Sequence, residues 1–150
     1  MDGNDTFKIA LTRAYAAPVD TVFDAWLTPA MARQFLFATE NGEMIRADID
    51  PEVGGELCFV DRRDDEDIEH LGEFLEIDRP RRIVFVFAVN RAPDFTRVAV
   101  DFASRAAPEG GEPGCELTLT HEMNPRYASF ADRTRQGWET ALDRLADVLA

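Results

Sequence analysis

The sequence predicts an α+β domain in which one long C-terminal helix covers the apolar face of an antiparallel sheet. Three observations lead to this prediction: residues 125–150 have a helical period, six short segments before them read as strands, and two short helices follow the first strand. Strands that follow one another through short turns pair as antiparallel neighbours. An amphipathic helix must bury its apolar stripe, so we expect it to cover the apolar face of the sheet.

The N-terminal segment predicts one strand and then two short helices. Residues 6–15 alternate between apolar side chains and polar or small ones, which is typical of a half-buried strand. Arg13 interrupts the apolar side, so it should lie at an end of the sheet with a partner. Pro18 suits the first turn of a helix, and Thr28 followed by Pro29 predicts the N-cap and first residue of a second helix.

Six further strands follow, separated by turns rich in glycine, proline and charged residues. Gly72 marks a candidate bulge, and residues 61–67 are predicted to form a charged hairpin tip. The segment 83–89 is apolar on both sides, so it should be central or covered on both faces. The predicted strands are 44–49, 56–60, 68–77, 83–89, 95–103 and 115–123.

The C-terminal segment places a run of apolar residues, three or four positions apart, on one helical stripe. A helix of about 20 residues is about 30 Å long, which is enough to cross a small domain. Charged side chains fill much of the remaining helix surface. The predicted stripe consists of Phe130, Thr134, Trp138, Leu142, Leu145 and Leu149.

Composition indicates a single acidic globular domain over residues 1–150. The chain has 29 acidic and 16 basic residues, and its net charge is −13. This balance argues against binding to nucleic acid or to anionic lipid surfaces, both of which require clustered Lys and Arg. Hydrophobic residues make up 45% of the chain, which supports a real core.

The sequence contains no recognisable membrane span or signal peptide. No apolar run approaches the roughly 20 residues of a span, and residues 1–5 are polar and acidic. Cys58 and Cys115 lack a CxxC spacing, which favours free thiols in a reducing compartment and leaves a bridge between them open. We therefore expect a cytoplasmic protein, monomeric or homodimeric, without membrane insertion.

Several motifs, in order and at characteristic spacing, resemble those of a known family. They are RAYAAP at 13–18, VFDAWLTP at 22–29, VGG at 53–55, GEFLEI at 72–77, LTLTH at 117–121, and Gly137-Trp138 with Leu142 and Leu145. The chain resembles the helix-grip fold of the START and birch-pollen-allergen-like superfamily (SRPBCC), and within it the heat-shock-protein-90 ATPase activator-like family. The resemblance implies a seven-stranded antiparallel sheet curled around the last helix, with an apolar cavity between them. Gln34-Phe35 stands where family members often carry tryptophans.

Two titratable residues are candidates for chemistry. His121 shares the apolar side of its strand, where it is suited to bond a ligand or to act as an acid or base. The alternative, which we favour, is a core histidine paired within the protein. Glu73 would point inward with Leu71, Leu75 and Ile77 unless a bulge at Gly72 resets the register. We favour a surface position for it, because an unpaired buried carboxylate is costly.

Aromatic residues are plentiful, with eleven phenylalanines among 150 residues. They suit an apolar ligand site, although each one alone is more often core filler. Gly137 within the last helix indicates either room for a ligand or close packing, and these two readings stand equal. The predicted cavity lining is Trp26, Phe35, Phe37, Phe59, Phe85, Phe87, His121, Tyr127, Phe130, Thr134 and Trp138.

The function expected from these features is the binding of a small apolar or aromatic molecule in an internal cavity. Neither a cofactor motif nor a metal motif is present, and His70 is predicted to lie at a solvated hairpin tip. Two alternatives are a cyclase-like or lyase-like enzyme that uses His121 and Glu73, and a co-chaperone or interaction domain with a chaperone partner. Catalysis is the less favoured reading, because no catalytic pair is compelling.

Overall fold

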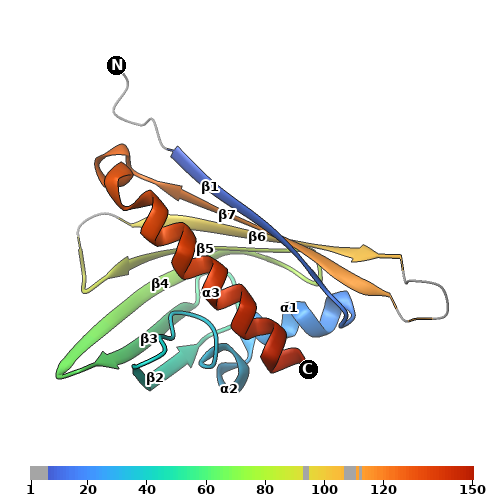
Figure 1. Ribbon diagram of the computed structural model, residues 1–150, viewed down its shortest axis with the longest axis horizontal. Coiled ribbons are helices and arrows are strands. Elements are labelled where there is room, and N and C mark those ends of the chain that lie inside the picture. Colours follow the sequence, from blue (N-terminus) through green and yellow to red (C-terminus); the bar gives the residue numbers. More distant parts are fainter. Residues whose placement is uncertain (1–6, 93–94, 107–110, 112) are drawn as a thin grey trace.

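A computed structural model, which describes residues 7–92, 95–106, 111 and 113–150, shows one curved antiparallel sheet with a long helix across its concave face (Figure 1). The sheet has seven strands in the order β1-β7-β6-β5-β4-β3-β2. The strands are β1 (Phe7–Tyr15), β2 (Glu43–Ile49), β3 (Glu56–Arg63), β4 (Glu66–Asp78), β5 (Arg82–Val89), β6 (Thr96–Arg105) and β7 (Gly114–Met123). The helices are α1 (Val19–Leu27), α2 (Pro29–Ala32), the 3-10 helix η1 (Pro125–Phe130) and α3 (Ala131–Leu149).

The sheet topology confirms the predicted helix-grip architecture. β1 pairs with β7 along its whole length, while β2 forms the opposite edge, so α1 and α2 carry the chain from one edge to the other. The doubly apolar strand β5 lies at the centre of the sheet, as its sequence predicts. Arg13 has the expected partner, because it forms an ion pair with Asp143 of α3.

Trp138, Leu142 and Leu145 of α3 are buried against the sheet, which confirms the central part of the predicted stripe. Phe130, the first residue of the predicted stripe, does not face the sheet with the others. The segment before α3 is a 3-10 helix with a tighter winding, and Phe130 is 47% exposed at its end. Gly137 faces open space, because a Cβ atom added there meets no described atom within 4 Å. The close-packing reading of this glycine is therefore wrong, and room for a ligand stays a prediction.

The prediction for β4 is wrong in register. The bulge lies between Phe74 and Glu76 and not at Gly72, which pairs in register with Leu57 and Phe87. Gly72 is required for another reason, because a Cβ atom there would overlap the backbone carbonyl oxygen of Val86.

This register decides which side chains of β4 face α3. His70, Gly72 and Phe74 are buried on the inner face, whereas Glu73 and Leu75 are exposed. The inward orientation considered for Glu73 is therefore excluded. The predicted solvated position of His70 is wrong, because only 6% of this residue is exposed.

The predicted hairpin tip is also shorter than expected. β3 continues to Arg63 and β4 begins at Glu66, so Asp61 lies within a strand and is 1% exposed. Cys58 and Cys115 are both buried and free, as the sequence favours.

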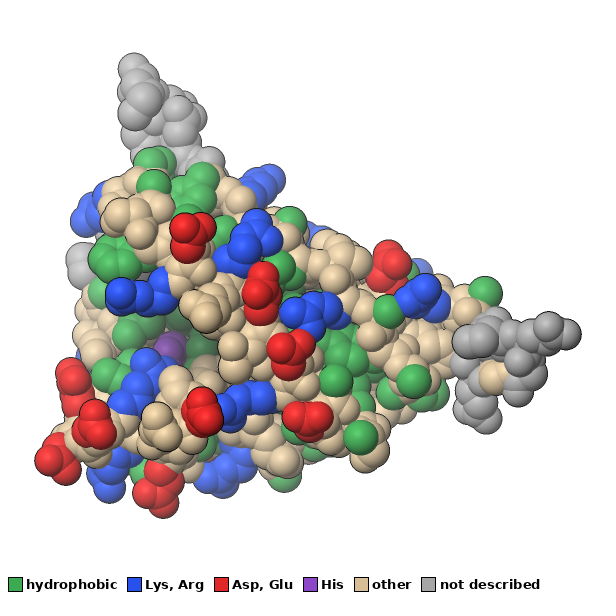
Figure 2. Space-filling view, in the orientation of Figure 1, with side chains coloured by type: hydrophobic (Ala, Val, Ile, Leu, Met, Phe, Trp, Pro, Cys, Tyr) green, Lys and Arg blue, Asp and Glu red, His purple; other side chains and the backbone are tan. Residues whose placement is uncertain are grey.

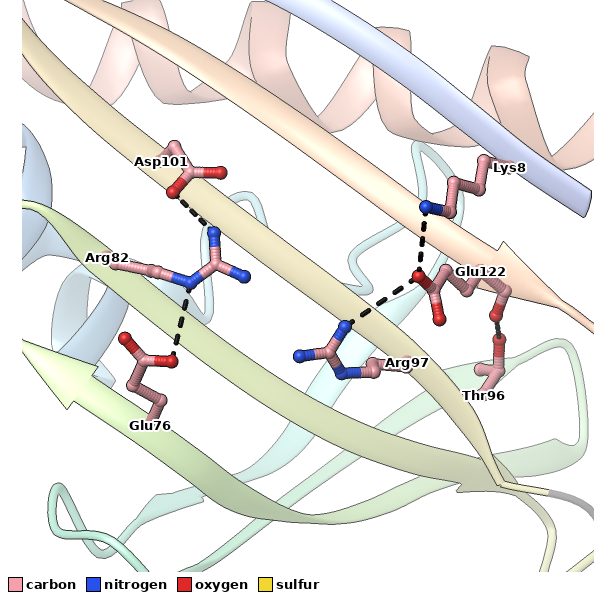
Figure 3. Close-up of polar contacts among 7 residues, drawn as sticks. All are labelled: Lys8, Glu76, Arg82, Thr96, Arg97, Asp101 and Glu122. Atoms are coloured by element: carbon pink, nitrogen blue, oxygen red, sulfur yellow. Dashed lines mark hydrogen bonds and ion pairs between the residues drawn. The ribbon is translucent and has the colours of Figure 1, made fainter. Parts of the chain in front are cut away.

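The sheet face away from α3 carries rows of ion pairs between neighbouring strands (Figure 3). Arg82 of β5 lies between Asp101 of β6 and Glu76 of β4, at 2.7 Å and 3.4 Å. On the same face, Glu122 of β7 contacts Lys8 and Arg97. The side chains of these pairs are 26% to 62% exposed, so each pair contributes little to stability, typically less than about 1 kcal/mol.

Candidate functional site

A continuous group of aromatic rings fills the space between α3 and the inner face of the sheet. We call it the aromatic cluster, and it comprises Trp26, Phe37, Phe59, His70, Phe87, His121 and Trp138. Neighbouring ring centroids within it are 4.2 to 6.5 Å apart, the distances typical of stacked and edge-to-face pairs. Six different elements and the segment between α2 and β2 contribute to the cluster, which is why sequence spacing alone does not reveal it.

His121 of β7 is fully engaged in hydrogen bonds within the protein. The indole Nε1–H of Trp138 donates to His121 Nδ1 at 2.9 Å. Because an indole nitrogen only donates, Nδ1 must accept, and the proton of the neutral ring is on Nε2. Nε2–H therefore donates to Thr96 Oγ1 at 2.6 Å, and the Thr96 hydroxyl donates to the backbone carbonyl of Glu122 at 2.7 Å.

This relay keeps His121 neutral. Burial lowers the pKa of His121 to about 4 from its ordinary value near 6.5. A proton on Nδ1 would also face the indole N–H of Trp138 and remove that hydrogen bond. His121 is thus a paired core histidine, the reading that its sequence position favours.

His70 of β4 is the second buried histidine, and it differs from His121 in one respect. Its Nδ1 atom is buried and has no hydrogen-bond partner among the residues that the structure describes. Burial is the main cause that lowers the pKa of His70 to about 4, and Arg63 lowers it further, while nearby backbone carbonyls raise it. The ring of Phe37 stacks on the imidazole with centroids 4.2 Å apart and planes at 14°.

Phe37 comes from the irregular segment between α2 and β2 and is partly exposed. Its φ angle is +62°, in the left-handed region that bulky side chains rarely adopt. Besides His70, its ring contacts Phe87 at 4.8 Å, Phe59 at 5.6 Å and Trp138 at 6.1 Å. Phe37 therefore enters the cluster from the side, between α3 and the sheet.

The buried carboxylate of Asp61 holds the same segment against β3. Thr39 Oγ1 donates to Asp61 Oδ2 at 2.7 Å, and Arg63 Nε donates to the same oxygen at 2.8 Å. Asp61 Oδ1 is buried, and no described residue forms a hydrogen bond with it. Gly42 lies so close that a Cβ atom there would overlap this carboxylate, which explains the glycine.

Enclosed space beside the cluster is small. A void lined by apolar residues, including Trp26, Phe59 and Phe85, has a volume of about 10 Å³, roughly that of one water molecule. On the surface, the molecule is hollowed beside α3, and a histidine is visible at the bottom of this hollow (Figure 2).

A larger depression of about 470 Å³ lies elsewhere, beside the start of α2 and the β2–β3 turn. Its lining includes the carboxylate residues Asp48, Asp50 and Glu56 and no residue of the aromatic cluster. It does not coincide with any predicted site residue.

The predicted lining residues fall into three groups. Phe35 and Phe85 are buried with the cluster members Trp26, Phe59, Phe87, His121 and Trp138, and Phe37 is partly buried among them. Thr134 of α3 is partly exposed. Tyr127 and Phe130 of η1 contact each other with centroids 6.5 Å apart outside the cluster, and Arg133 lies over the Phe130 ring.

Sequence reasoning missed His70 and Asp61. Asp61 lies on the inner face of β3, at a position where the sequence predicts a hairpin tip. His70 lies on the inner face of β4, for which the sequence predicts the wrong register. For His70 the sequence does contain a signal. The apolar Phe74 lies four positions after His70 and therefore on the same face of the strand.

Within residues 7–92, 95–106, 111 and 113–150, no three or more His, Cys, Asp or Glu side chains are grouped so that they would hold a metal ion. Among the helices of these same residues, none has the length and apolar character needed to cross a membrane.

Comparisons with known proteins agree with this architecture. The sequence model of a family described as "Activator of Hsp90 ATPase homolog 1-like protein" matches residues 16–150. No curated protein matches the chain. Protein CV1439 from Chromobacterium violaceum is 20% identical and has a TM-score of 0.78, with 95% of this chain and 96% of that chain covered.

Two further crystal structures are similar. A protein from Rhodobacter sphaeroides is 22% identical with a TM-score of 0.76, covering 95% of this chain and 91% of that one. Protein Ms6760 from Mycobacterium smegmatis is 16% identical with a TM-score of 0.75, covering 98% and 96%. At these identities the likeness establishes the fold.

Proposed function

The chain belongs to the activator of Hsp90 ATPase homolog 1-like family, and from this premise we propose that it is a helix-grip domain that binds a small, uncharged aromatic or apolar molecule. The binding site we propose is the aromatic cluster beneath α3. Membership of the family supports the fold but names no ligand, so the choice of ligand rests on the chemistry of the cluster.

One observation supports the proposal above the others. The imidazole of His70 is buried among aromatic rings, and its Nδ1 has no hydrogen-bond partner within the described part of the chain. Buried polar atoms in folded proteins are nearly always hydrogen-bonded, so an open one next to stacked rings is a feature of a binding site. His121, by contrast, has protein partners at both ring nitrogens.

The charge of the molecule favours an uncharged ligand. The chain has a net charge of −13, which repels anions. Both histidines of the cluster are neutral at pH 7, because burial lowers their pKa values to about 4. The guanidinium of Arg63 at the edge of the cluster is already paired with Asp61.

The same geometry weighs against catalysis by His121. An acid–base group must be able to exchange a proton with a substrate. Both nitrogens of His121 are occupied, by Trp138 and Thr96, and 4% of the residue is exposed. Glu73, the second group of the enzymatic alternative, is exposed on the other face of the sheet.

A thermal-shift screen with lipids, sterols and aromatic polyketides, followed by native mass spectrometry, tests the proposal. A ligand at 100 times its Kd should stabilise the folded protein by about 2.7 kcal/mol and so raise Tm. Phe87→Leu, which removes one ring of the cluster, should weaken binding of the ligand found. The matched change Phe95→Leu, at a ring that is 62% exposed, should leave binding unchanged. Equal weakening by both changes, or no ligand from the screen, contradicts the proposal.

A further inference from the structure

The ring of Phe37 lies in a box made of four other rings. His70 stacks on it at 4.2 Å, and Phe87, Phe59 and Trp138 surround it at 4.8, 5.6 and 6.1 Å. His70, Phe59 and Phe87 belong to the sheet and Trp138 belongs to α3, so the walls of the box are regular elements. Phe37 itself comes from an irregular segment.

The backbone of Phe37 is in an unfavourable conformation for its side chain. A φ of +62° is unfavourable in a non-glycine residue and persists only where the surroundings enforce it. The contacts of the ring with the box supply that enforcement. A replacement ring in the box would remove them and release the strained backbone.

The segment that carries Phe37 is attached to the sheet by few polar contacts. Thr39 donates to the buried carboxylate of Asp61, and Arg63 Nη2 donates to the Phe37 carbonyl oxygen at a long 3.5 Å. The other carboxylate oxygen of Asp61 has no hydrogen-bond partner in the ranges that the structure describes. These contacts fasten the segment over the box without burying it in the core.

The closed arrangement leaves little room for a ligand. The Phe37 ring fills the box itself, and a separate void lined by Trp26, Phe59 and Phe85 holds about 10 Å³, which is far below the size of an aromatic molecule. The proposed function therefore requires that some group move. Phe37 is the cluster ring that combines partial exposure, an irregular backbone and a left-handed φ.

We propose that Phe37 occupies the place of the ligand's aromatic ring in the free protein, and that the segment 37–42 moves away to admit the ligand. This inference rests on the proposed function and adds its regulation and ligand class. The ligand carries a planar ring, because the group it replaces lies within 14° of parallel to the His70 imidazole. Because the ligand competes with the Phe37 ring for this place, its apparent Kd equals the intrinsic Kd divided by the fraction of protein in which the segment is open.

The test uses 2-naphthol as an uncharged planar probe and measures its Kd by calorimetry and its association rate by tryptophan fluorescence. Phe37→Gly removes the ring and suits the left-handed backbone, and it should tighten binding about tenfold by removing the competition. Thr39→Val keeps the Phe37 ring but removes the hydrogen bond to Asp61, so it should speed association. Phe95→Ala, at an exposed ring, is the control and should match the wild type in both quantities.

Each contrary outcome is distinct. If the wild type binds and Phe37→Gly binds no tighter, Phe37 is not the occupant, and the inference fails while the proposed function stands. A second outcome is that 2-naphthol binds more tightly to Phe37→Gly but associates with Thr39→Val at the wild-type rate. The tighter binding is then due to a cavity created by the substitution, and the inference also fails. If no form binds the probe or any molecule of the screen, the proposed function fails together with the inference. Circular dichroism confirms that each variant is folded.

Discussion

The indole nitrogen of Trp138 and the imidazole Nδ1 of His121 are 2.9 Å apart, and this hydrogen bond joins α3 to β7. It fixes the tautomer of His121 and through it orients the hydroxyl of Thr96. The strands that carry His121 and Thr96 are neighbours in the sheet, so the relay connects helix, β7 and β6. This arrangement makes His121 a structural residue that holds α3 on the sheet.

His121→Ala should destabilise the protein by about 2–4 kcal/mol, because it leaves the Trp138 N–H unpaired and opens a cavity. His121→Gln should cost less, since its amide has an oxygen to accept from Trp138 and an N–H to donate to Thr96. Urea unfolding measures both values. Equal loss of stability in the two variants, or none in His121→Ala, would show that the relay has no energetic role.

Stability should fall as the pH is lowered from about 7.5 to about 5. The folded pKa values of His70 and His121 are about 4, below the unfolded value near 6.5, so the unfolded state binds more protons in this range. The stability due to the neutral rings is fully present above the unfolded pKa and is lost as the pH falls toward the folded one. The expected loss over this range is about 2 kcal/mol for each histidine.

His121→Gln serves as the control for this pH dependence. Its side chain does not titrate, so about half of the loss between pH 7.5 and pH 5 should disappear. The measurement is urea unfolding at several pH values for both proteins. A pH dependence identical in the variant and the wild type would mean that His121 does not contribute to it.

Gly137→Ala should stabilise the protein by up to about 1 kcal/mol, because alanine is the better helix former and its Cβ atom meets nothing within 4 Å. Thermal or urea unfolding measures the change. A loss of stability would mean that the surface of α3 at this position is covered by a second copy or another group in solution.

Gly72→Ala should have the opposite effect. Its Cβ atom would overlap the carbonyl oxygen of Val86 and lie 3.0 Å from the Cβ of Phe87, so the β4–β5 pairing must shift. Gly54→Ala is the comparison, because Gly54 has a φ of +85° in open space and strain is the only expected penalty, about 1–2 kcal/mol. A smaller loss of stability for Gly72→Ala than for Gly54→Ala would contradict the register of β4.

Much of the fold follows from the sequence, because most strands alternate cleanly and the helix stripe is regular. β7 is the clearest case: the parity of Leu117, Leu119 and His121 is that of the structure. β4 shows the limit. Leu71, Leu75 and Ile77 are spaced by even numbers of residues, which suggests that they share one inner face. The bulge between Phe74 and Glu76 reverses the alternation of β4. On the N-terminal side of the bulge, His70 and Phe74 therefore face inward.

The candidate site depends on contacts between distant segments, and these are not visible in the local pattern. The apolar period of α3 extends to Phe130 only if the 3-10 winding of η1 is ignored. The position of Phe37 depends on a left-handed residue and on the fastening of Thr39 to Asp61, two features that no periodicity signals. The buried state of Asp61 follows from the same contacts.

The most direct test of the account is an NMR titration of the wild-type protein with 2-naphthol. If the aromatic cluster beneath α3 is the binding site, the indole N–H of Trp138 and the ring protons of His70 shift in a saturable manner. The backbone amides of Ala47, Gly54 and Gly55, which line the depression of about 470 Å³, should then remain unchanged. Saturable shifts at that depression with none at Trp138 and His70 would contradict the account.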